Sequence, residues 1–244
     1  MQLTEPYAKI LPPPTIFCLD YFWDHNRSDS LPRFRQQDGI QLLQRIEYCA
    51  RISHRSEEAI TASSYDRFLR AVVIQHGDWS VIEHASITVE FLVDRGITHE
   101  LVRHRLFSFT QESTRFVNYL KRIGARFIKP KFPDDDEYKE DSSIGIWMNT
   151  IDACLDAYNK LLVLGCSPQI ARSVLPNALS SKIVVTGNLR QWRHFFIMRT
   201  TKETHPQMLE VTVPLLEDIK SVIPILFEDI EPGQSQNHNL KLPR

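Results

Sequence analysis

The chain has 244 residues, of which 42% are hydrophobic and 24% are charged, and its formal net charge is −1. A chain of this length buries roughly 70–75% of its unfolded surface, so it needs no disulfide or metal to hold a core. The balanced charge favours neither a nucleic-acid partner nor a membrane, and no apolar stretch approaches the ~20 residues of a membrane span. The four cysteines are scattered without a CxxC pair, which argues against a zinc ribbon or a disulfide framework. These features predict a soluble cytoplasmic protein.

The N-terminal part is predicted to be helical after an irregular start. Residues 1–38 are dotted with prolines, so we expect an irregular arm packed over the surface. Apolar residues recur at helical spacing from 40 to about 53 and again from 64 to 76, which predicts two helices. Gly77 is suited to end the second helix, because the residue after a helix often adopts a left-handed conformation.

A strand and a polar loop are expected next. Apolar and polar residues alternate over 87–93, as in a half-buried strand. Gly96 is then expected to turn the chain into a short helix with Thr98 as its N-cap. Residues 108–115 are polar and break the periodicity, so they are predicted to form a loop, and residues 116–120 a second strand.

The second half begins with an acidic run over 133–143. We expect a solvated loop there and no metal site, because consecutive carboxylates point in different directions. Apolar spacing then predicts a long helix that ends at Gly165. Ser167 followed by Pro168 is a typical helix start and predicts a short helix as far as residue 175.

Ile183 and Val185 mark a further strand, and Asn188 is suited to cap the helix behind it. A last helical stretch over 206–227 contains two prolines, at 214 and 224, which should kink or interrupt it. Together the elements predict an α/β (α+β) fold, a single mixed domain with a central antiparallel or mixed sheet flanked by helices. We expect three segments: an N-terminal arm over 1–38, a main domain over 39–230 and a flexible C-terminal tail over 231–244.

Basic residues are concentrated in two segments. Residues 95–126 contain seven arginines and lysines against two acids, and residues 188–202 contain four against none. For any one of these residues, a solvated or paired surface position is the simpler interpretation. Their concentration near the hydroxyls and amides of 108–115 favours a site for an anionic ligand, since guanidinium groups bind phosphate bidentately and never lose their charge.

Several familiar motifs are absent from the sequence. Neither GxGxxG nor GxxxxGK[ST] occurs, so a bound nucleotide would not use a Rossmann or P-loop cradle. His99 and His104 resemble the HExxH zinc motif, but they lie five positions apart and not four, which places them on different faces of a helix and disfavours a metal-dependent hydrolase. No serine or cysteine has the context of a nucleophile. This combination favours a protein that positions a cofactor and lets the cofactor carry the chemistry.

A second interpretation of the basic segment 95–126 is a single-stranded nucleic-acid-binding module. Four aromatic residues are interleaved with the basic ones, as in a base-stacking groove. They are Phe107, Phe109, Phe116 and Tyr119. Aromatic residues are more often part of a core, and the net charge of −1 is unusual for such a module.

One signature then links the segments. Arg103-His104-Arg105 is followed after seven residues by Ser113, a pattern that resembles the RHR-x7-S signature of flavin-dependent thymidylate synthases. Arg115, two residues after Ser113, also fits the family pattern. Further segments resemble this family in the same order along the chain. They are His76–His84 (HGDWSVIEH), Pro168–Pro176 (PQIARSVLP), Asn188–Arg199 and His205-Pro206-Gln207. The likeness spans about residues 40–230 and makes 39–230 the expected catalytic domain.

The resemblance implies an activity and its partners. In this family dUMP becomes dTMP, methylenetetrahydrofolate donates the carbon, reduced FAD donates the hydride, and NADPH reduces the flavin. It also implies a homotetramer with sites shared between subunits, small-molecule substrates, and neither a nucleic-acid nor a membrane partner. No metal is expected.

The resemblance also assigns residues. The positions that match FAD contacts are Ser80, Arg103, His104, Arg105, Gln111, Asn188 and His194. The positions that match dUMP contacts are Glu100, Arg103, Gln111, Ser113, Arg115, Arg172 and Arg199. We expect Arg199 to be catalytic, because a fixed cation beside the uracil ring would stabilise negative charge as C5 becomes nucleophilic. Ser113 is expected to orient dUMP and not to attack it.

Three positions depart from the family pattern or have an open role. Glu112 lies where an apolar residue is expected and adds an acid to the signature loop. The spacing from Arg199 to His205 is longer than in short-looped members, so a role for His205 near folate stays open. His84 is expected to be structural.

Overall fold

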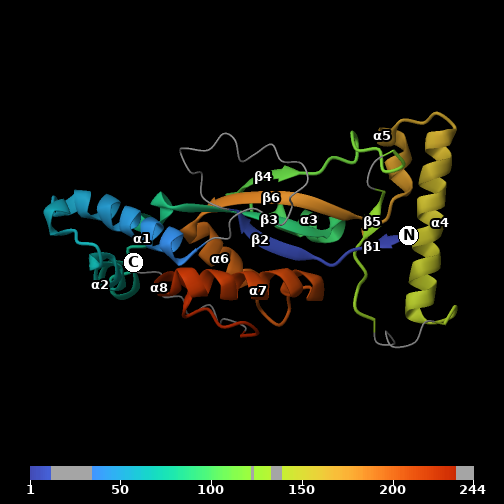
Figure 1. The fold of residues 1–244 in the computed structure, drawn as a ribbon. Coiled ribbons are helices and arrows are strands. Elements are labelled where there is room, and N and C mark those ends of the chain that lie inside the picture. The colour runs from blue at the N-terminus through green and yellow to red at the C-terminus, as the bar shows by residue number, and fades with distance from the viewer. Residues whose placement is uncertain (12–34, 122–123, 133–138, 235–244) are drawn as a thin grey trace. The chain divides into compact units, whose positions relative to one another are not determined.

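The computed structural model describes residues 1–11, 35–121, 124–132 and 139–234 (Figure 1). Its chain divides into two compact units, each built from several segments. Unit 1 takes in residues 1–7, 91–103 and 109–183, and unit 2 takes in residues 8–90, 104–108 and 184–244. Most of the predicted acidic run and most of the proline-rich arm lie outside the described residues.

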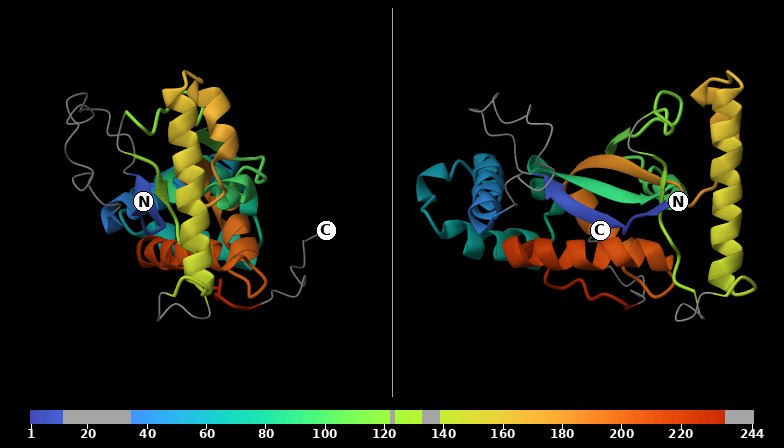
Figure 2. Two further views of the ribbon diagram at one scale, coloured as in Figure 1. Left: turned by 90° about the vertical axis from the view of Figure 1, so that its right-hand side faces the viewer. Right: turned by 45° about the vertical axis from the view of Figure 1, so that its right-hand side comes forward.

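Unit 1 is dominated by one long helix. Its helices and short strands are β1 (Gln2–Leu3), α3 (Arg95–Leu101), β5 (Arg126–Phe127), α4 (Ser143–Val163), α5 (Pro168–Ala171) and the 3-10 turn η6 (Arg172–Val174). Strands β1 and β5 pair in parallel. Figure 2 shows α4 as a straight helix beside α5. The buried Ile151 and Tyr158 of α4 pack against Phe127 and Leu179.

Unit 2 contains most of the other helices. They are α1 (Gln36–Arg51), η2 (Ile52–His54), η3 (Glu57–Ala59), α2 (Ser64–Leu69), the π-turn η4 (Arg70–Gln75), η5 (Trp79–His84), α6 (Leu189–Arg199), α7 (Pro206–Val222) and α8 (Pro224–Phe227). Helix α7 contacts both α6 and α1, and it runs beneath strand β2 in Figure 1. Among the residues that the structure describes, no helix is long and apolar enough to cross a membrane.

Four strands form the main sheet, in the order β2-β3-β6-β4. They are β2 (Tyr7–Leu11), β3 (Ser86–Asp94), β4 (Ser108–Gln111) and β6 (Ser180–Asn188). The backbone N–H of Leu189 donates to the Ala85 carbonyl at one end of the β3–β6 pair. The backbone N–H of Arg95 donates to the Asn177 carbonyl at the other end. Residue numbers therefore rise along β3 as they fall along β6, which makes the pair antiparallel. The predicted α/β fold class with an antiparallel or mixed sheet is confirmed.

Elements with strong periodicity match their predictions. Helices α1, α4 and α6 begin or end within a few residues of the predicted positions, and the Asn188 side chain caps α6 as expected. Gly77 and Gly165 both have positive φ angles at helix ends. In the last helical stretch only Pro224 separates two helices.

Pro214 lies inside α7 without ending it. The predicted helix over 64–76 changes after Leu69 from α to π geometry. The arm expected to be irregular contains two strands, β1 and β2, because their backbones find partners in β5 and β3. Such pairing is non-local and leaves little signal in a short, proline-rich segment.

The start of α3 was predicted wrongly. Asp94 is its N-cap, with a side-chain oxygen that accepts from the backbone N–H of Ile97 at 2.7 Å, so Gly96 lies in the first turn of the helix. Thr98, the predicted cap, is fully buried, and its hydroxyl donates to the Arg95 carbonyl. Asp94 and Thr98 are both residue types that favour the N-cap position, but only Asp94 has an extended backbone conformation before the helix.

The signature loop also differs from its prediction. Its first four residues form the edge strand β4, and the strand expected over 116–120 is absent. The backbone N–H of Glu112 donates to the Lys182 carbonyl, which continues the pairing with β6. Polar edge strands lack the alternation that reveals a half-buried strand, because neither face is fully covered.

Aromatic side chains fill the core of unit 2. Phe107, Trp192, Phe195, Phe196 and Phe227 meet mostly edge to face, with ring centroids from 4.7 to 6.1 Å apart. The Trp192 indole N–H donates to the Ile87 carbonyl, so its polar atom is satisfied inside the core. Gly187 faces this cluster. A Cβ there would lie 2.3 Å from two carbons of the Phe107 ring.

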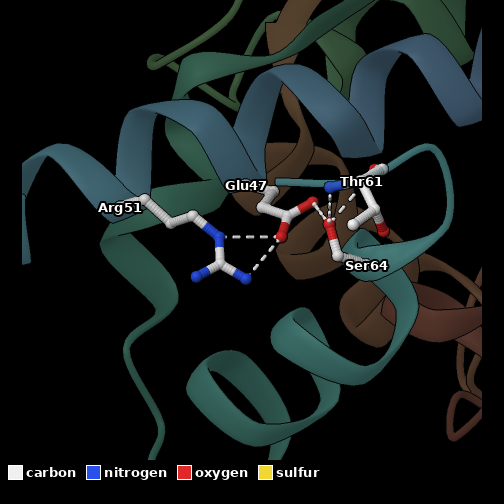
Figure 3. A network of polar contacts seen from close by, with 4 residues as sticks. All are labelled: Glu47, Arg51, Thr61 and Ser64. Carbon is white, nitrogen blue, oxygen red and sulfur yellow. Dashed lines mark hydrogen bonds and ion pairs between the residues drawn. The ribbon is translucent and has the colours of Figure 1, made fainter. Parts of the chain in front are cut away.

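A buried carboxylate joins α1 to α2. Glu47 is fully buried and accepts from Arg51 at 2.8 Å and from the Ser64 hydroxyl at 2.9 Å (Figure 3). The backbone N–H of Thr61 donates in turn to the Ser64 oxygen, and the Arg51 guanidinium lies 4.3 Å from the Phe68 ring centroid. Because an unpaired buried charge is costly, this network fixes how α2 returns against α1.

The end of the described chain is tied to the end of α6. The backbone N–H of Gly233 donates to the carbonyl of Thr200, the residue that follows Arg199, at 2.7 Å. Gly233 has a φ of 79°, a conformation that favours glycine. Residues 231–234 of the predicted tail are therefore anchored, and the remainder lies outside the described residues.

Candidate functional site

The predicted site residues fall into two groups, one in each unit. Unit 1 holds most of those expected to contact dUMP, namely Glu100, Arg103, Gln111, Ser113, Arg115 and Arg172. Unit 2 holds Arg199 and most of those expected to contact FAD, namely Ser80, His104, Arg105, Asn188 and His194. We describe the two groups separately.

A cavity of about 480 Å³ lies in unit 1. Its lining combines two arginines with short polar side chains and two leucines. The lining residues are Arg95, Thr114, Gln169, Arg172, Ser173, Leu175, Asn177 and Leu179. The lining includes no carboxylate, so the cavity is suited to an anion.

The signature loop and the start of α5 are joined by hydrogen bonds at this cavity. Arg172 donates to the Thr114 hydroxyl at 3.1 Å, and Arg115 donates to the side chain of Gln169 at 3.1 Å. Both arginines are exposed, so each guanidinium reaches the surface. Of the two arginines that line the cavity, only Arg172 was predicted as a site residue.

Arg95 is the second cation of the lining, and it was not predicted as a site residue. It follows the cap Asp94 at the start of α3, and its Nη1 is buried without a hydrogen-bond partner among the described residues. A guanidinium nitrogen in that state is expected to be satisfied by a ligand or an ordered water. In the sequence, Arg95 is marked only by its place in the basic segment 95–126. It shares that segment with six other basic residues, so the sequence did not single it out.

Gln111 and Ser113 are held by local hydrogen bonds. The amide nitrogen of Gln111 donates to the hydroxyls of Thr98 and Ser181, at 2.9 and 3.2 Å, which directs both of its hydrogens into the protein. The Ser113 hydroxyl accepts from the backbone N–H of Arg115 at 3.3 Å. No histidine or carboxylate within the described residues accepts a hydrogen bond from Ser113, which agrees with a role in orientation.

Glu112 forms a hydrogen bond with a tyrosine of unit 1. Its carboxylate accepts from the hydroxyl of Tyr119 at 2.7 Å, and Tyr158 accepts from the backbone N–H of Tyr119. Burial, together with the Glu112 carboxylate, raises the pKa of Tyr119 far above its usual value. The hydroxyl therefore stays protonated and donates to Glu112. The acid that departs from the family pattern serves to anchor the loop.

Arg199 is the most firmly held predicted residue of unit 2. Its Nε donates to Nε2 of His104 at 2.9 Å, and its carbonyl accepts from the hydroxyl of Thr212 at 2.8 Å. The His104 ring packs edge-on against Phe195 and Phe107, with centroid distances of 5.0 and 6.2 Å. The structure thus brings together two predicted residues that lie 95 positions apart in the sequence.

The other predicted contacts of unit 2 are less constrained. Asn188 uses its side-chain oxygen to cap α6, where it accepts from the backbone N–H of Gln191 at 2.9 Å. Ser80, Arg105 and His194 are exposed. Arg105, and Arg103 of unit 1, have no carboxylate partner within the described part of the chain. The positive charge of both side chains is therefore available to an anionic ligand.

Two histidines outside the assigned site have structural surroundings. His205 caps α7, with an Nδ1 that accepts from the backbone N–H of Gln207 at 3.2 Å. His84 is exposed and ends the turn η5 that leads into β3, and its structural role stays a prediction. Across the described residues, no three histidine, cysteine or acidic side chains gather as ligands for a metal.

Comparison with known proteins identifies the family. Residues 41–225 match the family model of the thymidylate synthase complementing protein. A flavin-dependent thymidylate synthase from Geobacter sulfurreducens is 32% identical over 195 residues, covering 80% of this chain and 82% of the relative. One from Corynebacterium diphtheriae is 36% identical over 182 residues, covering 68% and 69%. The chain belongs to the flavin-dependent thymidylate synthase family.

Membership of the flavin-dependent thymidylate synthase family confirms the prediction made from the Arg103-His104-Arg105 signature. A solved structure agrees on the fold. A UMP/dUMP methylase from Streptomyces cacaoi, bound to 5-bromo-dUMP, superposes with a TM-score of 0.67 at 20% identity, over 93% of this chain and 96% of its own. At that identity the likeness supports the fold alone.

The nucleic-acid interpretation loses its stacking surface. Phe107 and Tyr119 are 8% and 7% exposed and belong to the cores of their units, whereas Phe116 is exposed. Stacked bases need several aromatic faces open to solvent along one groove. Two of the four interleaved aromatic side chains of this family member are therefore core residues, which removes them from such a groove.

Proposed function

We propose that the chain converts dUMP to dTMP as a flavin-dependent thymidylate synthase. The hydrogen at C5 of uracil is replaced by a methyl group, and methylenetetrahydrofolate supplies the carbon and leaves as tetrahydrofolate. Beside the family membership, the observation that best supports this reaction is the cavity of unit 1, where Arg95 and Arg172 offer two permanent cations to an anionic substrate.

The phosphate of dUMP is the group that suits this cavity. The buried Nη1 of Arg95 has no partner among the described residues and Arg172 already bonds to Thr114, so a phosphate would satisfy the first and be oriented by the second. Ser113 and Arg115, which follow β4, would contact the nucleotide from the same loop. Glu100, Arg103 and Gln111 complete the substrate contacts that we propose in unit 1.

Arg199 would activate the ring. A guanidinium beside the uracil carbonyls stabilises the negative charge that builds up as C5 becomes nucleophilic, and a fixed cation does so without reorganising. The bond that Arg199 donates to His104 and the bond that it accepts from Thr212 hold Arg199 in this way. No nucleophilic side chain is needed, which agrees with the finding that, among the described residues, no base accepts a hydrogen bond from Ser113.

FAD fits, by charge, the residues that the family resemblance assigns to it. Arg103 and Arg105 are exposed arginines without carboxylate partners among the described residues, and they suit a pyrophosphate. Ser80, Asn188 and His194 offer polar edges, and Gln111 and His104 complete the proposed set. When bound, FAD would supply the hydride that completes the methyl group, with NADPH as the source of reducing equivalents.

We further propose a homotetramer whose sites combine residues of several subunits. Exposed apolar residues on and near α4 support an interface, since Val163 and Leu164 are 78% and 80% exposed. Light scattering coupled to gel filtration measures the mass directly, and a monomer at micromolar concentration would contradict the tetramer. The cytoplasmic location stays a prediction of the sequence.

The activity is tested with purified protein, FAD, NADPH, methylenetetrahydrofolate and dUMP, by chromatography of the dTMP formed. We expect a yellow protein that releases FAD on denaturation and forms dTMP in proportion to NADPH consumed. A colourless protein that takes up no FAD and forms no dTMP would overturn the proposal.

Variants separate binding from chemistry. Arg172→Ala should raise the KM for dUMP by about 10- to 100-fold, the weight of a charged hydrogen bond. Arg70→Ala is the matched control, because Arg70 pairs with Glu228 on the surface of unit 2 and should leave the KM unchanged. Arg199→Ala should keep its flavin and lose about 10²–10³ in kcat. Ser113→Ala should retain measurable turnover, and total loss with dUMP still bound would make Ser113 a nucleophile.

A further inference from the structure

The contact between Arg199 and His104 is specific in its atoms. Nε of the guanidinium donates to Nε2 of the imidazole at 2.9 Å. An arginine Nε always carries its hydrogen, so Nε2 of His104 must be the acceptor and the ring must be neutral. A neutral imidazole with an accepting Nε2 carries its hydrogen on Nδ1.

The imidazole is itself held in place by packing. His104 lies in the turn between α3 and β4, with its ring edge-on to Phe195 of α6 and to Phe107. Phe107 in turn packs against Trp192, with ring centroids 4.7 Å apart. A ring wedged among aromatic side chains has few rotamers, so its Nε2 points in a fixed direction.

The backbone at Arg199 is fixed independently. The hydroxyl of Thr212, a fully buried residue of α7, donates to the Arg199 carbonyl at 2.8 Å. With the backbone and Nε both restrained, the plane and direction of the guanidinium are determined. A ligand of Arg199 would then be met by the terminal nitrogens Nη1 and Nη2, which form the fork that suits a bidentate acceptor.

We propose that His104 is a positioning residue that acts through Arg199, by holding the guanidinium in the orientation in which it meets the uracil ring. This inference rests on the proposed function, and it gives His104 a task in addition to its proposed contact with FAD. Its effect on turnover is large because a displacement of about 1 Å at a catalytic group costs on the order of 10²-fold in rate. Thr212 supports the same orientation from the backbone.

A matched pair of variants tests the hydrogen bond. Glutamine can place its amide oxygen near the position of Nε2, whereas methionine has a similar size and no comparable acceptor. We expect His104→Gln to keep kcat within about 10-fold of the wild type and His104→Met to lose about 100-fold. Because His104 also belongs to the proposed FAD contacts, both variants are assayed at saturating FAD, where the KM for dUMP should stay close to the wild-type value.

The outcomes distinguish the alternatives. Equal kcat values in the two variants would overturn the proposal, because the acceptor would then be irrelevant. A kcat per bound flavin that equals the wild-type value in both variants would also overturn it, because His104 would then act through the cofactor alone. A wild-type protein that forms no dTMP would instead refute the proposed function, and the positioning role would then be judged on thermal unfolding alone.

Thermal unfolding supplies that second measurement, through a cycle of His104→Met, Arg199→Met and the double variant. If the two side chains are bonded, the double variant should unfold within about 2 °C of the less stable single variant. Strictly additive shifts would show that the contact is absent in solution and would overturn the proposal. This cycle needs no substrate and no activity.

Discussion

Gly187 provides a sharp test of how the aromatic core supports Arg199. A Cβ at this position would lie 2.3 Å from Cδ1 and Cε1 of Phe107, and ordinary contact begins only at 3.4 Å. Gly187→Ala therefore forces the Phe107 ring to move by about an ångström or the strand β6 to shift. The same Cβ would approach the side-chain oxygen of Gln191 at 2.9 Å, which accepts from the backbone N–H of Asn188 at the start of α6.

Overpacking of this kind costs about 1–3 kcal/mol. For a domain of this size each kilocalorie lowers the unfolding midpoint by about 2–4 °C, so we expect a fall of roughly 2–12 °C. Phe107 also packs against His104, so kcat for dTMP formation should fall while the flavin stays bound. Circular dichroism follows the unfolding, and chromatography follows the product.

A second substitution makes the reasoning refutable. Phe107→Leu removes the ring atoms that the new methyl group would meet, so Gly187→Ala should cost clearly less in that background than in the wild type. An equal cost in both backgrounds would show that the strain lies elsewhere. A Gly187→Ala protein as stable and active as the wild type would refute the close approach itself.

Three further predictions concern networks away from the cavity. Arg193→Met should lower the free energy of unfolding in urea by about 2 kcal/mol. Burial alone would raise the pKa of its partner Asp229, but the hydrogen bonds and charge of Arg193 outweigh burial and hold that pKa below 3.8. The loss of unfolding free energy in the variant should therefore be complete above pH 3.8 and should shrink as pH falls through the lowered pKa. Tyr119→Phe should cost about 1 kcal/mol and raise the KM for dUMP, because Glu112 loses its donor. Glu47→Ala should cost about 3–5 kcal/mol in the same urea assay.

The sequence predicts the parts of this fold that depend on local pattern. Helices α1, α4 and α6 follow from apolar spacing, and the Asn188 cap follows from residue type. The start of α3 was missed because two capping residues, Asp94 and Thr98, compete within five positions. Strand β4 was missed because its pairing with β6 is a tertiary contact between distant segments.

The candidate site divides in the same way. The residue types of the signature and its spacing indicated arginines for an anionic ligand, and the family is confirmed. Spacing did not reveal that Arg95 lines the cavity or that His104 bonds to Arg199, because both depend on how distant segments pack. Glu112 was expected to add an acid to the signature loop, and the sequence did not reveal that its carboxylate accepts from the Tyr119 hydroxyl.

The bond from Gly233 to Thr200 bears on how this protein can be engineered. It places the last described turn of the chain one residue away from the arginine that we expect to be catalytic. A truncation after Gln234 leaves this bond intact, whereas one that removes Gly233 leaves the Thr200 carbonyl without its donor. Because Gly233 has a positive φ, a bulkier residue there would strain the same contact. Affinity tags and fusion partners are therefore best joined beyond residue 234, and shortened versions of the enzyme should end no earlier.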